Sequence, residues 1–379
     1  MKNVLVIGGG IASSIYAYRV KKEHPDYQVT MLEQSDKILK RVLVSGNGRS
    51  NFFNEQLLKN TVYQAYNYMS FLEYFDLTSY SEKLLDMLSN DLNFSYYFDS
   101  DGRAYPFSNT AESLWLVLVK GLEEVGVKII TDTKVTGIDP ETKIVSTEYS
   151  DSFKYDTLFI GAGGSAYDRR DNAFKKVLAP LNIEYIKQTS ALCPLKVKQD
   201  LPQILNGVRL KGNLVLYKDD TPFYDELGEI LFKEDGISGI CVFDASLFIN
   251  KESNFKIVFN PFMHDDCMTS LNGKKSLSYL EGLFPSRLIN YFRKSGYKEM
   301  DDDDVLKTLT FDIKEKYPLK NSQISLGGIN PTEINSNLSL MKYENIFVGG
   351  EIVDLHGICG GYNIGSAMLM GYKAAGFVD

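Results

Sequence analysis

The sequence has few histidines and few cysteines, and both shortages exclude kinds of site. It contains 3 histidines and 4 cysteines, and the cysteines are scattered, at Cys193, Cys241, Cys267 and Cys359. No two of them form a CxxC pair, which excludes a cysteine-rich zinc site and a vicinal redox disulfide and is typical of a reducing compartment. His264, in the stretch HDDC, has no second cluster of ligands, so we expect no metal site.

The sequence also lacks an excess of basic residues and any hydrophobic run of membrane-spanning length. Lysine and arginine number 41 against 49 acidic residues, which gives a formal net charge of −8. Binding to nucleic acid or to an anionic membrane needs clustered basic residues, so we expect neither partner. The N-terminus begins directly with a strand pattern rather than with a signal peptide. We therefore expect a cytoplasmic monomer or homodimer that acts on a small molecule.

Glycine is abundant, and the first glycine cluster follows a strand-like segment at the N-terminus. Residues 4–7, VLVI, are typical of a buried parallel strand, and SSIYAYRVKK after the glycines has helical spacing. Gly8 and Gly10 allow the backbone N–H groups and the helix N-terminus to approach a pyrophosphate. Ser13 stands where the dinucleotide-binding fingerprint has its third glycine or alanine. It is small enough to permit close packing of the helix on the strand.

An acidic residue follows the second expected strand, YQVTMLEQ. This strand ends at Glu33 and Gln34, close to where the fold needs a carboxylate for the ribose hydroxyls of adenosine. A carboxylate there suits a ribose without a 2′-phosphate. Strand, glycine turn, helix, strand and acid together predict a Rossmann-like α/β domain that binds a dinucleotide.

The segment that follows Glu33 and Gln34 favours FAD over NAD as the cofactor. SDKILKRVLVSGNGRSNFFNE is too rich in glycine and polar residues for regular structure. A nicotinamide dehydrogenase does not need such a loop, whereas bound FAD needs donors along its diphosphate, ribityl chain and ring. We expect FAD as the cofactor, with seven loop residues lining it: Arg41, Ser45, Gly46, Asn47, Gly48, Arg49 and Asn51.

Two further glycine clusters support FAD. YDTLFIGAGGSAYD is a strand that runs into Gly161 and Ala162, and it resembles the second glycine turn of flavoproteins with two dinucleotide folds. NIFVGGEIVDLHGICGGYNIG is a strand followed by an acidic loop and a helix that starts around residues 360–363. A helix N-terminus at the N1/C2 carbonyl edge of a flavin would stabilise the negative charge of the reduced ring.

Five motifs in order resemble a family of bacterial flavoproteins. This family includes BaiN-type 3-dehydro-bile-acid reductases, aminoacetone oxidase and YhiN-like proteins. The motifs extend over almost the whole chain and read VLVSGNGRSNFFN, GRAYPFSNTAESL, GEILFKEDGISG, SLGGINPTEIN and GGEIVDLHGICGGYN. The resemblance implies an FAD-binding domain of the two-dinucleotide-fold type that carries an inserted β-barrel and a small helical domain.

The same resemblance implies which residues hold FAD. It assigns the diphosphate to the first glycine turn, the ribose to Glu33 and the adenine to the backbone of Val135. Gly161 and Ala162 are expected to line the same side of the cofactor as Val135. It assigns the ribityl and diphosphate side to Gly350, Glu351 and Asp354. The isoalloxazine ring is assigned to Gly360, Gly361, Tyr362 and Asn363.

The resemblance and a change of pattern predict the domain boundaries. Short strands replace the α/β pattern from about Lys187, and helical spacing follows. We expect the FAD-binding domain to comprise 1–186 and 325–379, with an insert at 187–324. Within the insert we expect a β-barrel at about 187–243 and 305–324 and a helical module at about 244–304.

The sequence departs from the family where the chemistry is expected. Ser50 replaces the usual cysteine, Lys233 and Glu234 stand where the family often has Thr-His, and His356 stands where many members have an acid. His356 is a candidate proton shuttle or a structural histidine, and Tyr362 is a candidate hydroxyl donor or a packing residue. We therefore assign no catalytic residue.

Three kinds of function remain open. The first is a reductase in which NADH or NADPH transiently reduces FAD, and the flavin then passes a hydride through N5 to a small unsaturated molecule. The second is an amine oxidase of the aminoacetone type, which releases hydrogen peroxide. The third, less favoured by the acidic composition, is a flavoprotein that acts on RNA or a redox module without turnover.

Overall fold

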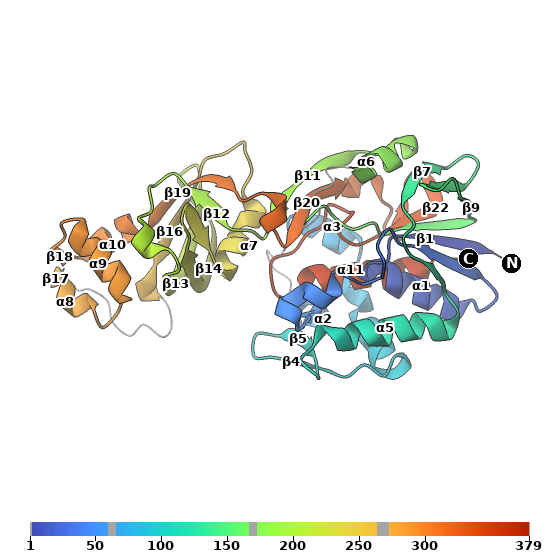
Figure 1. The fold of residues 1–379 in the computed structure, drawn as a ribbon, viewed down its shortest axis with the longest axis horizontal. Helices are drawn as coiled ribbons and strands as arrows, with labels where there is room; N and C mark the ends of the chain where they lie inside the picture. Colours follow the sequence, from blue (N-terminus) through green and yellow to red (C-terminus); the bar gives the residue numbers. More distant parts are fainter. Residues whose placement is uncertain (1, 60–65, 167–172, 264–272, 379) are drawn as a thin grey trace. The chain divides into compact units, whose positions relative to one another are not determined.

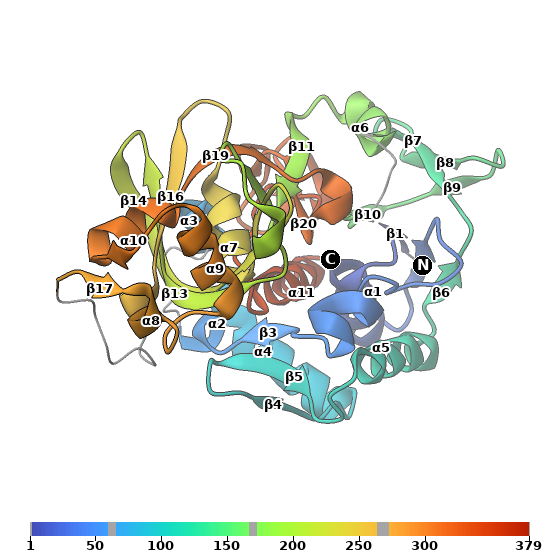
Figure 2. The ribbon, with the colours of Figure 1, turned by 60° about the vertical axis from the view of Figure 1, so that its left-hand side comes forward.

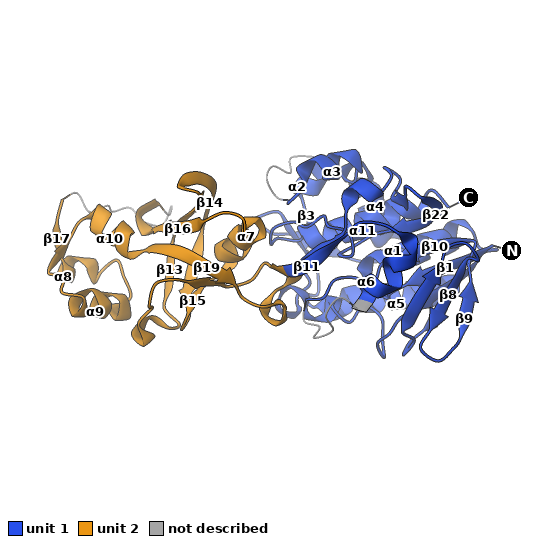
Figure 3. Cartoon of the chain, turned by 90° about the horizontal axis from the view of Figure 1, so that it is seen from above, with its two compact units in different colours: residues 1–189, 325–379 blue, residues 190–324 orange. Residues whose placement is uncertain are grey.

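The chain forms two compact units in the computed structural model, which describes residues 2–59, 66–166, 173–263 and 273–378 (Figure 1). Unit 1 comprises residues 1–189 and 325–379, and unit 2 comprises residues 190–324 (Figure 3). The second unit is therefore an insertion into the first. It begins three residues after the expected start of the insert at 187. His264 and Cys267 lie outside the described residues.

A sheet of six strands forms the centre of unit 1, in the order β21-β22-β10-β1-β2-β6. All neighbours are parallel except β21 and β22. The strands are β1 (Asn3–Ile7), β2 (Gln28–Leu32), β6 (Lys128–Ile130), β10 (Thr157–Ile160), β21 (Ser339–Leu340) and β22 (Tyr343–Val348). Because β1, β2, β10 and β22 are parallel, their carboxyl ends meet at one edge of the sheet. The three glycine clusters and Glu33 follow these four ends, so the fold brings them together.

Three helices pack in unit 1 close to this sheet (Figure 2). They are α1 (Ile11–Glu23), α5 (Ala111–Val125) and α11 (Tyr362–Ala375). Gly371 on α11 lies against the backbone of Ala12 on α1, and a Cβ at this position would overlap the Ala12 carbonyl oxygen. Since small residues allow close approach of helices, this contact sets the start of α1 against the C-terminal half of α11.

Smaller elements complete unit 1. One sheet of three strands contains β3 (Phe53–Asn54), β4 (Tyr96–Phe98) and β5 (Arg103–Pro106), and another contains β7 (Val135–Asp139), β8 (Ile144–Thr147) and β9 (Ser152–Lys154). The short helices are α2 (Gln56–Lys59), α3 (Met69–Tyr74), α4 (Ser81–Asp86) and α6 (Ala173–Leu178). The pair β11 (Tyr185–Ala191) and β20 (Ile324–Ile329) carries the chain out of unit 1 and back.

Unit 2 contains a closed barrel in the order β12-β15-β14-β13-β16-β19. Its strands are β12 (Leu195–Val197), β13 (Arg209–Lys218), β14 (Thr221–Phe232), β15 (Gly236–Ser238), β16 (Phe255–Asn260) and β19 (Thr310–Lys316). Closure pairs every strand on both sides and so removes exposed sheet edges. The other elements are α7 (Ile240–Phe248), β17 (Lys275–Ser276), α8 (Leu277–Leu280), α9 (Ser286–Lys294), β18 (Glu299–Met300) and α10 (Asp302–Thr308).

The structure corrects the division of the insert. Residues 255–260 were expected in a helical module at about 244–304, but they form β16, a central barrel strand between β13 and β19. Phe255, Ile257 and Phe259 are buried and alternate with half-buried residues, which is the period-two pattern of a strand with one face on the core. Helices also extend into the ranges expected for the barrel, since α7 starts at Ile240 and α10 ends at Thr308.

Candidate functional site

The first glycine turn is constrained differently at its two fingerprint glycines. Gly8 has a φ of +91°, and a Cβ there would lie 2.6 Å from the Gly161 carbonyl oxygen. The protein itself therefore requires glycine at position 8. Gly10 has a φ of −79°, and a Cβ there would meet only the Gly161 carbonyl oxygen, at an ordinary 3.7 Å. The protein itself has room for a Cβ at position 10, so the fold does not require glycine there.

The N-terminus of α1 is open toward an anion. Gly10 is its N-cap, and within this helix no side chain caps the end and the first turn contains no acidic residue. The first backbone N–H groups of a helix lack partners within the helix and carry partial positive charge. Ser13 is fully buried, with its Oγ 3.5 Å from the Gly161 carbonyl oxygen. Its small side chain allows the close packing that the sequence predicted.

A cavity of about 120 Å³ lies beside this turn, at the carboxyl edge of the sheet. It brings together five of the residues predicted from sequence, namely Gly8, Glu33, Gln34, Val135 and Ala162. We call it the adenosine cavity, after the part of FAD that the sequence analysis assigns to Glu33 and Val135. Other residues that line it were not among those predicted. Four lie close in sequence to predicted ones, namely Thr133, Lys134, Gly163 and Ser165, and four come from other segments, namely Phe174, Val177, Tyr185 and Gln188.

The carboxylate of Glu33 is held in place by backbone donors. Its Oε2 accepts a hydrogen bond from the Gly9 N–H at 2.6 Å, and its Oε1 accepts one from the Ser35 N–H at 2.7 Å. A carboxylate oxygen can accept more than one hydrogen bond. Glu33 is thus fixed at the cavity and still able to accept from the hydroxyl groups of a ligand.

Arg41 and Glu351 bind each other across the site. Arg41 Nη1 donates to Glu351 Oε2 at 2.9 Å, and its Nη2 donates to the carbonyl oxygens of Gly164 and Ala166 at 2.6 Å each. The other Glu351 oxygen accepts from the backbone N–H and Oγ of Ser325, both at 2.8 Å. The loop after β2, the second glycine turn and the loop after β22 are therefore joined by one charged pair.

The expected loop at residues 41–51 is a compact turn. Val42–Gly48 form a 3₁₀ segment that is interrupted by non-helical angles at Ser45, Gly46 and Asn47. Gly46 and Gly48 both have positive φ, as expected where the chain bends sharply. Arg49 donates to Asn109 Oδ1 at 2.9 Å.

One polar atom of this turn is buried without a partner. Asn51 Oδ1 has no hydrogen bond within the part of the chain that the structure describes. Buried acceptors in native proteins are normally satisfied. An N–H donor supplied by a ligand would satisfy this oxygen.

Asp354 and His356 form a buried pair in the loop after β22. Asp354 Oδ1 accepts from the Gly327 N–H at 2.9 Å and from Asn67 Nδ2 at 3.1 Å. His356 Nε2 lies 3.3 Å from the same oxygen and 3.1 Å from the Gly327 carbonyl oxygen. Both residues are at most 3% exposed. These contacts favour the structural interpretation of His356 and make Asp354 an organiser of the loop.

The N-terminus of α11 resembles that of α1. Gly361 is its N-cap with a φ of +95°, and in this helix neither a side-chain cap nor an acidic first turn is present. Asn363 bonds the backbone N–H and carbonyl oxygen of Gly357 at 2.9 and 2.7 Å, and Asn54 Nδ2 donates to the Gly360 carbonyl oxygen at 2.9 Å. Buried Tyr362 donates its hydroxyl to Gln56 Oε1 at 2.7 Å. The side chains of Tyr362 and Asn363 thus hold this loop by hydrogen bonds.

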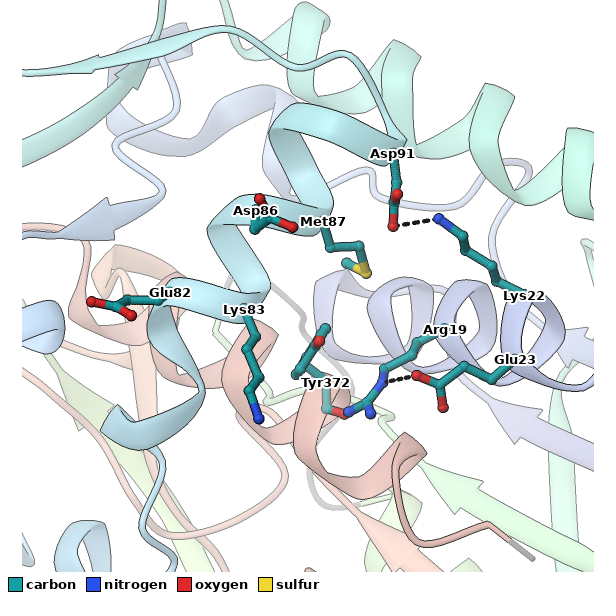
Figure 4. Close-up of a pocket in the computed structure, with 9 residues that line it drawn as sticks. All are labelled: Arg19, Lys22, Glu23, Glu82, Lys83, Asp86, Met87, Asp91 and Tyr372. Atoms are coloured by element: carbon teal, nitrogen blue, oxygen red, sulfur yellow. Dashed lines mark hydrogen bonds and ion pairs between the residues drawn. The ribbon is translucent and has the colours of Figure 1, made fainter.

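A larger cavity, of about 610 Å³, lies at the opposite ends of α1 and α11 (Figure 4). Arg19 pairs with Glu23 at 2.7 Å and stacks on the Tyr372 ring at 4.1 Å, and Lys22 pairs with Asp91. These charges satisfy one another, and no glycine turn borders this cavity. The adenosine cavity and the two helix N-termini are therefore the candidate site.

Comparisons with known proteins indicate the family of this chain. The family model described as HI0933-like protein Rossmann domain matches residues 2–377. The chain is 26% identical to the 3-dehydro-bile acid delta(4,6)-reductase of Clostridium scindens, over 99% of this chain and 98% of that protein. It is 21% identical to the ribosomal RNA dihydrouridine synthase of Haemophilus influenzae, over 98% of this chain and 97% of that protein.

A solved structure of low identity shares the fold. The open conformation of a flavocytochrome c3 fumarate reductase has a TM-score of 0.50 and 12% identity, and the match covers 99% of this chain and 77% of that one. In the described residues, no helix is both long and apolar enough to cross a membrane. The family match over almost the whole chain and the glycine turns at one sheet edge lead to one conclusion. The chain belongs to the HI0933-like family and is an FAD-dependent oxidoreductase with a Rossmann-type FAD-binding domain.

Proposed function

We propose that this protein reduces a carbon–carbon double bond conjugated to a carbonyl group in a small organic molecule, with NADH or NADPH as the transient electron donor. The observation that carries this proposal is the chemistry shared by the two relatives named above. One is named for the reduction of a 3-dehydro-bile acid and the other for the formation of dihydrouridine. Both names describe addition of hydrogen across such a bond, and both proteins match almost the whole chain.

The residues of the site suit FAD. Gly8, Gly10 and the N-terminus of α1 would hold the diphosphate, Glu33 the ribose, and the backbone at Val135 the adenine. The turn at 41–51 would cover the rest of the cofactor, and its unsatisfied Asn51 Oδ1 would accept an N–H. FAD supplies the hydride chemistry once it is bound.

The chain itself contributes fixed electrostatics to this chemistry. The uncapped N-terminus of α11 presents partial positive charge where negative charge would develop. Asn54 and Asn363 hold the preceding loop by hydrogen bonds of 2.7 to 2.9 Å. Donors that are already oriented need no reorganisation during the reaction, so they can stabilise the developing charge at once.

RNA is the second candidate substrate, because one relative is a ribosomal RNA dihydrouridine synthase. The formal net charge of −8 opposes it, since RNA binding depends strongly on phosphate contacts. Neither of these two relatives is named as an amine oxidase, so that alternative has less support.

Anaerobic mixing of the purified holoprotein with each donor tests the proposal. Rapid bleaching of the flavin band by NADH or NADPH, followed by recolouring with an α,β-unsaturated ketone, is the expected result. Bleaching by aminoacetone alone, with peroxide on admission of air, would identify an oxidase. Recolouring by uridine-containing ribosomal RNA and not by small ketones would favour the second candidate.

A further inference from the structure

Gln188 lies on β11 with its side chain buried in the wall of the adenosine cavity. It is 4% exposed and lines the same cavity as Glu33 and Val135. Its Oε1 accepts a hydrogen bond from Ser165 Oγ at 2.5 Å. Its Nε2 is buried and has no hydrogen-bond partner among the residues described.

In the structure, the oxygen end of this amide lies toward Ser165. The Ser165 hydroxyl holds the oxygen end of Gln188, and the Ser165 N–H donates in turn to Ser325 Oγ at 3.0 Å. The amino end is therefore the unsatisfied one. A buried donor without an acceptor destabilises the folded state, and native proteins contain few of them. When such a donor lines a ligand cavity, an acceptor on the ligand is the group that would satisfy it.

We propose that Gln188 Nε2 donates a hydrogen bond to an acceptor on the adenosine half of FAD, and that this bond helps the protein to select FAD over FMN. The inference rests on the proposed function only in placing FAD in the adenosine cavity. The adenine ring nitrogens, the ribose oxygens and the adjoining phosphate are all acceptors. FMN has none of the adenosine acceptors, so it cannot make this bond.

The test is a titration of the full chain, freed of flavin, with FAD, FMN and ADP. FAD and FMN binding are followed by flavin fluorescence and ADP binding by calorimetry. Gln188→Met removes the donor without adding charge, Gln188→Glu keeps the acceptor for Ser165 but replaces the donor, and exposed Gln203→Met is the matched control. We expect Gln188→Met to weaken FAD and ADP binding by the same factor, about three- to tenfold, and to leave FMN binding unchanged. Gln188→Glu should weaken FAD binding further.

Each other outcome has a separate meaning. If the unsubstituted protein prefers FAD to FMN but Gln188→Met keeps its affinity for FAD and ADP, the role of Gln188 is refuted and the proposed function stands. If the unsubstituted protein binds FAD no more tightly than FMN and does not bind ADP, the adenosine cavity does not hold the cofactor. The placement of FAD in the proposed function would then be wrong. An equal loss for FAD and FMN would show general damage to the site and would also refute the role of Gln188.

Discussion

The two fingerprint glycines should respond differently to the same substitution. Gly10→Ala adds a methyl group that meets only the Gly161 carbonyl oxygen at 3.7 Å, in a backbone conformation that alanine adopts readily. Loss of glycine flexibility in the unfolded chain stabilises by about 0.4–1 kcal/mol, and alanine is a poorer N-cap than glycine by a similar amount. These effects offset each other, so the flavin-free protein should keep its melting temperature within a few degrees.

The same methyl group should weaken FAD binding, because it occupies space that a diphosphate needs. Overpacking of a closely fitted contact costs about 1–3 kcal/mol, which corresponds to a roughly 5- to 150-fold rise in the Kd for FAD. Gly8→Ala should instead destabilise the flavin-free fold itself. Its φ is +91°, and its Cβ would lie 2.6 Å from the Gly161 carbonyl oxygen, which together cost about 2–5 kcal/mol.

Thermal melting of both flavin-free variants by circular dichroism, together with FAD titration by fluorescence, measures the two effects separately. An unchanged melting temperature with much weaker FAD binding in Gly10→Ala confirms that the ligand, not the fold, needs this glycine. Wild-type affinity for FAD in Gly10→Ala would refute the placement of the diphosphate at this turn. A stable Gly8→Ala protein would refute the steric analysis.

Three further predictions concern side chains around the site and in the insert. Tyr362→Phe removes the 2.7 Å hydrogen bond to Gln56 and should lower the free energy of unfolding by about 1 kcal/mol with FAD still bound; loss of FAD would indicate a direct contact with the ring. His356→Gln should lower the melting temperature and leave the pH profile of kcat unchanged, because the imidazole contacts buried Asp354 and backbone. Loss of the acidic or basic side of that pH profile would instead support His356 as a proton shuttle. Burial raises the pKa of the Cys241 thiol to about 12, so little of it is the reactive thiolate at pH 8. In a Cys267→Ser variant, a thiol reagent at pH 8 should therefore modify half-buried Cys359 first. Faster labelling of Cys241 would contradict its burial.

Local sequence patterns predicted some of the residues that line the adenosine cavity and missed others. Gly8 and Glu33 directly follow a strand and Ala162 lies one residue further on, so strand patterning and glycine chemistry were enough to predict that the three residues lie together. Gln188 was missed because it has no such signal. It lies in an ordinary β-strand, and only the pairing of β11 with β20 carries it to the cavity wall.

The roles of predicted residues also depended on distant partners. Arg41 and Glu351 were both predicted to contact FAD, but the structure pairs them with each other across 310 positions of sequence. Asp354 and Asn363 likewise bind backbone and side chains of neighbouring loops. A polar residue in a loop is evidence of a site, whereas the direction of its side chain depends on what the fold sets beside it.

The sequence by itself indicated the family through its five ordered motifs. It also determined the Rossmann-type domain and the positions of the glycine turns, because these depend on backbone angles and short-range periodicity. Only the tertiary structure decided that residues 255–260 complete a closed barrel, that Asn51 and Gln188 are left with unsatisfied polar atoms, and that Gly8 is required by the protein while Gly10 is not. These features depend on contacts between segments far apart in the chain, and such contacts exist only once the chain has folded.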